Sequence, residues 1–334
     1  MKFPFDFSIV LVFRMLFPGA VLAAAYSPLL LTLAWKFGYQ PDLMVAFPIQ
    51  AVVWGWLIVL CDQPIYMLYE GRRYWPNFLW RMSRGREEAR LRDLEAGAAD
   101  AMQKTDPRRY LESNIALLAF PLDEKNQPVA AYPTRLGNLL RAYETYPNRV
   151  YKLDPIFYWY RLWLVLDKDL REELDQAQAL ADSALYVSAA FALSVPVVLL
   201  YAVVSSVSYV DFLYVPASPF ALLRIAVAAT VFSYACYRLS YYPHVQYGEL
   251  FKGLFDQYRD KLTFVDDAVE LAEAAGADKA NASVEKYRIA SRFLRWNRIR
   301  PPGETRNYTP QEWQAELARR AAMPPPASSQ SNSP

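Results

Sequence analysis

Residues 219–239 read PFALLRIAVAATVFSYACYRL, and this stretch decides the class of fold. Ser218 and Pro219 open it as a serine cap and a proline at the first helical position, where a missing N–H is harmless. The run that follows is long enough for the roughly 20 mainly apolar residues that a helix needs to cross a bilayer core. The stretch therefore predicts a transmembrane helix.

Three more stretches meet the same requirement, at residues 16–35, 43–61 and 185–207. Hydrophobic residues make up 54% of the chain while charged residues still reach 21%, so the apolar content is concentrated in blocks. Prolines inside these stretches are tolerated because neighbouring helices and waters satisfy the carbonyls that they free. We expect a mainly all-α, polytopic membrane protein with two transmembrane helical hairpins.

Lysine and arginine predict the orientation, because they are enriched on the cytoplasmic side of membrane proteins. The loop at residues 36–42 holds one lysine, and residues 208–218 hold neither lysine nor arginine. Residues 70–92 instead carry seven arginines against three acidic residues. The two short loops are therefore predicted to face outward, with both termini and the long central segment in the cytoplasm.

Residues 1–25 also resemble a secretory signal peptide, with the alanines at 23–25 as a cleavage site. Asp6 and Arg14 interrupt its apolar region, however, and the apolar run continues past the alanines to Trp35. We therefore expect an uncleaved membrane anchor.

The sequence divides into five predicted parts. Residues 1–68 contain the first hairpin, preceded by an interfacial helix over 5–17 that is broken at Pro18. Residues 69–183 form a mostly helical cytoplasmic domain, and residues 184–240 form the second hairpin. Residues 241–300 form C-terminal cytoplasmic helices, and residues 301–334 form a mostly disordered tail.

Local signals predict several cytoplasmic helices. Thr134 and Asp154 are predicted to be N-caps of two helices, and leucines at helical spacing follow Thr134. The helix after Thr134 is expected to end near Pro147. Residues 96–106 are small and polar and indicate a loop, whereas residues 115–122 fit either a strand or a buried helix.

The third and fourth transmembrane helices are expected to continue into the cytoplasm as stalks. No helix breaker occurs between Asp167 and Pro196, and a helix of about 40 residues would be roughly 60 Å long, twice the bilayer core. The fourth helix is expected to continue past Pro243. Two shorter helices are predicted at residues 283–296 and 310–320.

A mixture of arginine and aromatic residues directly follows the second stretch. Aromatic rings favour the headgroup region, and juxtamembrane arginines are attracted to anionic lipid by about 1 kcal/mol each. Three interpretations are open: a general positive flank with an aromatic belt, a specific anionic-lipid site, or a base-stacking surface. The candidate lipid or partner contacts are Arg72, Arg73, Trp75, Trp80, Arg81 and Arg84.

The residues that catalysis and metal binding require are scarce. Cys61, Cys236 and the single His244 supply almost no ligands for a metal site, and His244 is expected to have an interfacial or capping role. No phosphate-binding glycine loop, nucleophile elbow or zinc-protease motif occurs. We expect no cofactor. This scarcity favours a non-enzymatic protein but leaves an enzyme open, and the net charge of +2 argues against a nucleic-acid partner.

Arg224 lies within the fourth stretch, where an ionisable residue is costly and often functional. It is only about 8 Å along the helix from Pro219, so its long side chain can reach the outer surface or pair with Asp211. The alternative is an ion or ligand path that contains Arg224 and Asp211.

Three segments carry a resemblance to a known family. They are EGRRYWP at residues 70–76, YPTRLGN at 132–138 and YGELFKGLFDQYR at 247–259. Together they resemble segments of a family of uncharacterised bacterial inner-membrane proteins with four transmembrane helices. The resemblance implies a bacterial inner membrane and a similar topology, but no activity and no site residues.

Three functional hypotheses follow. The first is a non-enzymatic membrane scaffold or signalling component, whose cytoplasmic surface binds membrane lipids, anionic ones in particular, or protein partners. The alternative is a homo-oligomeric ion channel or transport-related pore, with Arg224 on an anion path. The third is an enzyme that acts on lipid at the inner leaflet.

Overall fold

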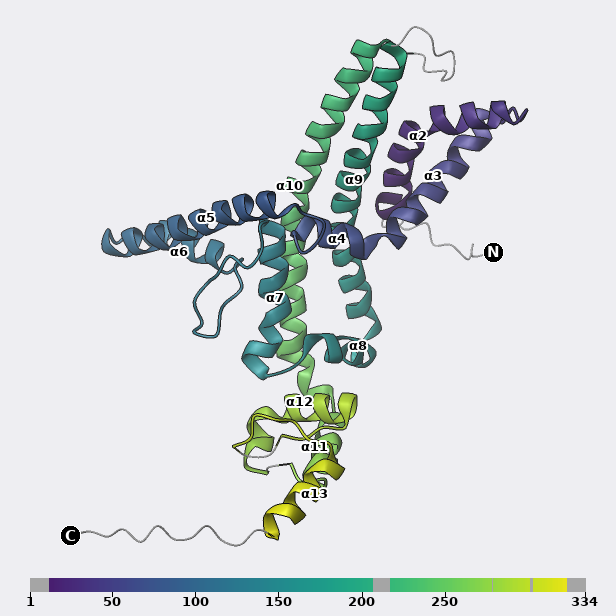
Figure 1. The fold of residues 1–334 in the computed structure, drawn as a ribbon. Coiled ribbons are helices and arrows are strands. Elements are labelled where there is room, and N and C mark those ends of the chain that lie inside the picture. The colour runs from purple at the N-terminus through teal and green to yellow at the C-terminus, as the bar shows by residue number, and fades with distance from the viewer. Residues whose placement is uncertain (1–11, 207–216, 278, 301–302, 323–334) are drawn as a thin grey trace, which may run out of the picture. The chain divides into compact units, whose positions relative to one another are not determined.

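The computed structural model describes residues 12–206, 217–277, 279–300 and 303–322 (Figure 1). In these residues every regular element is helical, and two isolated β-bridges accompany the helices. The prediction of an all-α chain is therefore confirmed for the described part. The helices are α2 (Phe17–Lys36), α3 (Leu43–Leu60), α4 (Asp62–Glu70), α5 (Asn77–Gln103), α6 (Pro107–Leu117), α7 (Arg135–Tyr151), α8 (Pro155–Val165), α9 (Lys168–Ser206), α10 (Pro219–Tyr258), α11 (Phe264–Ala274), α12 (Lys279–Trp296) and α13 (Pro310–Ala321).

Four of these helices are long and apolar enough to cross a membrane, which confirms the four predicted stretches. They are α2 together with a π-helical turn before it (Val12–Leu16), α3, α9 and α10. α9 contains 39 residues and α10 contains 40, and each passes through an internal proline, Pro196 and Pro243. Each is therefore close to the length of about 40 residues expected from the sequence.

Side-chain caps begin several helices where the sequence predicts them. The Ser218 hydroxyl accepts a hydrogen bond from the Ala221 N–H at 3.3 Å, and the Asp154 carboxylate accepts one from the Ile156 N–H at 3.0 Å. Thr309 forms a capping box at the start of α13. Each cap satisfies an N–H that the first helical turn leaves without a partner.

Several helix boundaries differ from the predictions. α5 continues to Gln103 through the segment predicted as a loop, because that segment is rich in alanine, the strongest helix former. α7 passes Pro147, which lies inside the helix, and ends at Tyr151, although a proline removes one backbone donor from the helix. α12 begins at Lys279, before the predicted start.

The N-terminal and central apolar segments also differ from the expectations. Residues 12–36 stay helical across Pro18, which occupies the first turn of α2, so the described part has no break there. Residues 5–11 of the expected interfacial helix lie outside the described residues. In the segment 115–122, α6 ends at Leu117 and the chain then turns, so no strand forms.

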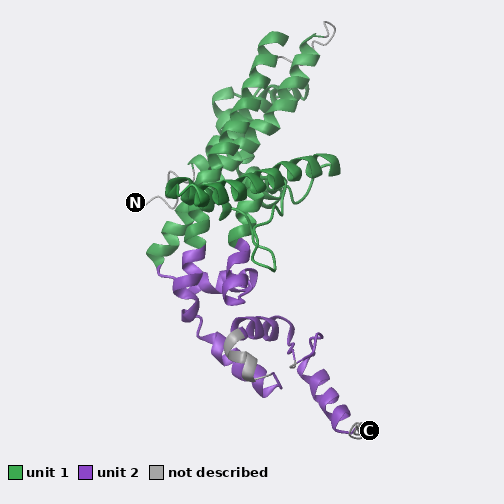
Figure 2. Cartoon of the chain, turned by 90° about the vertical axis from the view of Figure 1, so that its left-hand side faces the viewer, with its two compact units in different colours: residues 1–143, 168–251 green, residues 144–167, 252–334 purple. Residues whose placement is uncertain are grey.

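The chain divides into two compact units, each of which is discontinuous in sequence (Figure 2). Unit 1 contains residues 1–143 and 168–251, and unit 2 contains residues 144–167 and 252–334. Unit 1 includes all of α2 to α6 and α9, whereas unit 2 includes all of α8 and α11 to α13.

In unit 1, small residues allow α3 to approach α2 and the π-helical turn before α2 closely. A Cβ atom added to Gly19 would lie 1.9 Å from the Ala51 carbonyl oxygen, and one added to Gly55 would lie 2.3 Å from the Met15 carbonyl oxygen. Small residues at such contacts are typical of helix packing in membranes.

α9 and α10 are joined by two reciprocal hydrogen bonds. The Ser188 hydroxyl donates to the Ser233 carbonyl at 2.8 Å, and the Ser233 hydroxyl donates to the Ser188 carbonyl at 2.9 Å. The rings of Phe191 and Phe232 stack beside them with centroids 5.6 Å apart. The two helices are thus held in one register.

Unit 2 is built around a buried tyrosine. The Tyr158 hydroxyl donates to the Tyr287 carbonyl at 2.7 Å, and the Tyr158 ring stacks on Phe264. A second cluster packs Ala272, Ile299 and Trp313 together.

Candidate functional site: a pocket lined by arginine and tyrosine

The turn after α4 is tightly fixed. Gly71 has a φ of +76°, which favours glycine, and a Cβ atom there would lie 2.2 Å from the Pro133 side chain. The Trp75 indole N–H donates to the Leu68 carbonyl at 2.7 Å, and the Trp80 indole donates to the Gly71 carbonyl at 3.0 Å. The segment EGRRYWP therefore folds back on the end of α4.

The start of α7 is locked to the end of α4. The Thr134 hydroxyl donates to the Glu70 carbonyl at 3.1 Å and accepts from the Gly137 N–H at 2.9 Å. The buried Asn138 amide donates to the Tyr132 carbonyl at 3.0 Å, and its oxygen accepts from the Tyr132 N–H at 2.8 Å. The segments EGRRYWP and YPTRLGN, far apart in sequence, thus form one structural junction.

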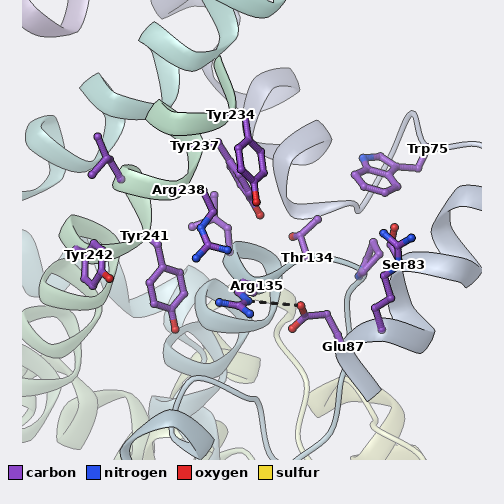
Figure 3. A pocket seen from close by; sticks show the side chains of 14 residues that line it. Trp75, Ser83, Glu87, Thr134, Arg135, Tyr234, Tyr237, Arg238, Tyr241 and Tyr242 are labelled. Atoms are coloured by element: carbon purple, nitrogen blue, oxygen red, sulfur yellow. Dashed lines mark ion pairs between the residues drawn. The ribbon is translucent and has the colours of Figure 1, made fainter. Parts of the chain in front are cut away.

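A pocket of about 630 Å³ lies beside this junction, between α5, α7 and α10 (Figure 3). In the view of Figure 3, α10 contributes tyrosines and Arg238 on one side, α5 contributes Ser83 and Glu87 on the other, and Arg135 lies between them. The lining residues are Trp75, Ser83, Arg86, Glu87, Pro133, Thr134, Arg135, Leu136, Tyr234, Tyr237, Arg238, Leu239, Tyr241 and Tyr242.

The pocket carries a positive charge. Glu87 is its one acidic lining residue, and this carboxylate pairs with Arg90 at 3.1 Å and with Arg135 at 3.9 Å. Within the described part of the chain, Arg86 and Arg238 form no ion pair, and both are exposed. Two guanidinium groups are therefore available to a ligand that enters the pocket.

A smaller apolar hollow of about 320 Å³ adjoins the pocket. It shares Trp75, Thr134 and Tyr237 with the larger pocket and adds Leu68 and Tyr69. A ligand with a charged group and an apolar part would meet both kinds of surface here.

The position of the pocket along α10 relates it to the bilayer. Leu239 is 20 residues after Pro219, about 30 Å at 1.5 Å per residue, which is the thickness of a bilayer core. The residues of α10 that line the pocket surround this point. The pocket is therefore at the level of the lipid headgroups if α10 crosses the bilayer from Pro219.

The structure does not bring the six predicted contact residues together at one site. Only Trp75 lines the pocket. Arg72 pairs with Glu70, and the Arg84 guanidinium donates to the Ala130 carbonyl at 3.1 Å, so both support the local fold. Trp80 is held by the hydrogen bond to Gly71 described above. The remaining two residues, Arg73 and Arg81, are exposed on the surface.

The pocket residues that the sequence did not single out come from three helices. Arg86 belongs to the basic segment, Arg135 follows the cap of α7, and Arg238 ends the fourth apolar stretch. The one available signal was the group of tyrosines around Arg238, at the end of an apolar run.

Arg224 does not lie at this pocket. It is exposed near the start of α10, with its guanidinium 4.4 Å from the centroid of the Phe220 ring. Asp211, its expected partner, lies outside the described residues. No group of three or more histidine, cysteine or acidic side chains that could hold a metal ion occurs in the described part.

No family model, no curated protein and no solved structure matches the chain. The fold and the pocket define the class as an all-helical protein with four helices fit to cross a membrane and a basic, tyrosine-lined pocket in the first unit.

Proposed function

We propose that this chain is a non-enzymatic, multi-pass membrane scaffold or signalling protein that binds the headgroup of an anionic phospholipid in the pocket between α5, α7 and α10. One observation carries the proposal: Arg86 and Arg238 face a pocket that also has tyrosine hydroxyls, with an apolar hollow beside it. Arginine is suited to phosphate because its guanidinium presents several donors in a fixed plane.

The orientation that fits this proposal is the one predicted from the arginine distribution. The two transmembrane hairpins, α2 with α3 and α9 with α10, would then have their loops outside and both termini in the cytoplasm. The pocket would lie at the inner leaflet, where anionic lipids attract basic residues. The family resemblance would place this leaflet in a bacterial inner membrane.

The test uses the full chain in nanodiscs that contain phosphatidylglycerol in a phosphatidylcholine background. Native mass spectrometry would count the retained phosphatidylglycerol molecules. The double variant Arg86→Gln/Arg238→Gln should bind at least about 30-fold more weakly, because each pocket guanidinium loses a charge-assisted hydrogen bond to the lipid phosphate, worth roughly 1 kcal/mol or more.

Two controls distinguish a pocket from a diffuse basic surface. The double variant Arg73→Gln/Arg81→Gln removes the same charge from exposed positions outside the pocket, and Arg108→Gln removes one charge from the exposed surface of α6, which does not line the pocket. Both should retain nearly wild-type binding. Equal losses in the two double variants would contradict the proposal in favour of a diffuse positive flank.

A further inference from the structure

A second polar cluster in unit 1 lies among helices and does not line the pocket. Asp182 of α9 and His244 of α10 are 2% and 1% exposed, respectively, and Tyr66 of α4 lies between them. The Tyr66 hydroxyl is 2.5 Å from Asp182 Oδ1 and 2.9 Å from His244 Nε2. Buried ionisable groups in a membrane protein mark functional sites by default, because they are costly to keep there.

The tautomer of His244 follows from the contact of its Nδ1 atom with Ser240. His244 Nδ1 is 2.6 Å from the Ser240 carbonyl oxygen. A carbonyl oxygen only accepts hydrogen bonds, so Nδ1 must carry a proton. In the neutral imidazole Nε2 is then an acceptor, and it faces the Tyr66 hydroxyl.

The cluster therefore has one proton fewer than its two hydrogen bonds need. With a neutral His244 and an ionised Asp182, Nε2 and Oδ1 are both acceptors, and the Tyr66 hydroxyl has a single proton to donate. One acceptor in a buried place would be left without a donor, which is unfavourable. One additional proton satisfies both hydrogen bonds.

We propose that Asp182, Tyr66 and His244 together form a binding site for one exchangeable proton. In one form the proton is on His244 Nε2, which donates to the Tyr66 oxygen while the Tyr66 hydroxyl donates to Asp182 Oδ1. In the other form the proton is on Asp182, which donates to the Tyr66 oxygen while the hydroxyl donates to His244 Nε2.

The two forms interconvert through the tyrosine without a change of total charge. The Nε2–H bond breaks as a proton passes to the Tyr66 oxygen, and the original Tyr66 O–H bond breaks as its proton passes to Asp182 Oδ1. Burial and the charge of Asp182 raise the pKa of the Tyr66 hydroxyl well above its usual value, so Tyr66 relays the proton and does not stay ionised.

Other charged and titratable groups surround the three residues. Arg14, from the π-helical turn before α2, pairs with Asp182 Oδ2 at 2.9 Å and favours the form with an ionised Asp182. The burial of His244 favours the neutral imidazole and opposes that effect. Among the described residues, the other titratable groups that interact with the cluster are Asp62 of α4, Tyr143 of α7, Asp175 and Tyr186 of α9, and Tyr247 of α10.

His244 is the single histidine of the chain, which makes the test direct. Full-length protein labelled with ¹⁵N-histidine and reconstituted in nanodiscs would give nitrogen signals from one imidazole. The wild type should show a protonated Nδ1 at every pH and one pH-dependent change of the Nε2 signal, as the cluster gains or loses its shared proton. Loss of the Nδ1 proton in the wild type would overturn the proposal without any variant.

Two variants test the coupling within the cluster. Tyr66→Phe and Asp182→Asn should each move the titration of Nε2 to lower pH by about one unit or more, because protonated His244 loses an acceptor or a nearby negative charge. Tyr201→Phe is the matched control, since its buried hydroxyl donates to the Ala25 carbonyl at 2.9 Å, away from the cluster. It should leave the titration unchanged.

If Nε2 titrates at the same pH in the wild type, Tyr66→Phe and Asp182→Asn, the three residues do not share a proton. Lipid binding at the pocket is measured separately and does not depend on the cluster, so failure of one proposal leaves the other standing.

Discussion

At the residue scale, Gly137 shows how closely the polypeptide approaches itself beside the pocket. A Cβ atom at this position would lie 2.3 Å from the Glu70 carbonyl oxygen and 2.9 Å from Tyr132 Cβ. We expect Gly137→Ala to destabilise the protein by about 1–3 kcal/mol, because backbone and not a flexible side chain must move. Thermal unfolding in detergent, followed by circular dichroism, measures the change.

Gly85 provides the matched control for that substitution. It lies in α5, and a Cβ atom there would meet nothing within 4 Å. Gly85→Ala should therefore leave the stability unchanged or raise it by up to about 1 kcal/mol, because alanine favours the helix. Equal destabilisation by both substitutions would contradict the close contact between Gly137 and Glu70.

Single residues were also where the sequence was least informative. His244 was expected at an interface or a cap, yet it is buried and bonded to Tyr66. These two residues are separated by 178 positions, and no local pattern records such a distance. By contrast, Asp154 and Ser218 were correctly predicted as caps, because a cap depends only on the next few residues.

At the scale of elements, the contact between α4 and α7 depends on one hydroxyl. Thr134→Val removes both the bond to the Glu70 carbonyl and the cap on the Gly137 N–H. We expect a loss of about 2 kcal/mol in stability and weaker lipid binding, since α7 supports one wall of the pocket. Thr134→Ser keeps the hydroxyl and should behave like the wild type, and a stability loss as large as that of Thr134→Val would argue against the hydrogen bonds as the cause.

The tyrosines that join α8 and α12 make unit 2 sensitive to alkaline pH. Burial raises the pKa of Tyr158 and of Tyr287, and the hydrogen bond from Tyr287 to Asp260 raises the pKa of Tyr287 further. The folded state therefore keeps these phenol protons to a higher pH than the unfolded state. Their contribution to stability is constant below about pH 10 and falls above it.

Thermal unfolding of the full chain as a function of pH checks this expectation. The unfolding temperature should decline above about pH 10, and the decline should be less steep in Tyr158→Phe because that variant has one phenol fewer to ionise. An identical decline in the two proteins would show that Tyr158 is not responsible.

Helix boundaries were harder to predict than helices. The alanine-rich end of α5 reads as a loop by its small and polar residues, but alanine is also the strongest helix former, and Ala101 is buried there. α7 likewise continues through Pro147. A proline or a polar segment weakens a helix locally, and the rest of the fold decides whether the helix ends there.

At the scale of the whole molecule, the proposed orientation can be measured by cysteine labelling. In a background where Cys61 and Cys236 are replaced by serine, Phe37→Cys places a thiol between α2 and α3, and Lys125→Cys places one in the loop after α6. A membrane-impermeant maleimide should label Phe37→Cys in intact cells and Lys125→Cys only after permeabilisation. The reverse pattern would show that the orientation is inverted.

Sequence alone predicted the four apolar helices because hydropathy is a local property. The pocket could not be predicted in the same way. Arg86, Arg135 and Arg238 belong to three separate helices, and only the folding of unit 1 brings them to one cavity. The sequence does predict a basic segment here, but most of its arginines either support the local fold or lie on the surface.

The paired hydrogen bonds of Ser188 and Ser233 have a mechanical consequence. Because each hydroxyl donates to the other residue's carbonyl, neither α9 nor α10 can slide or rotate about its own axis without breaking both bonds. We therefore expect a displacement of either helix along its axis to carry the other helix with it, because relative movement would cost both hydrogen bonds.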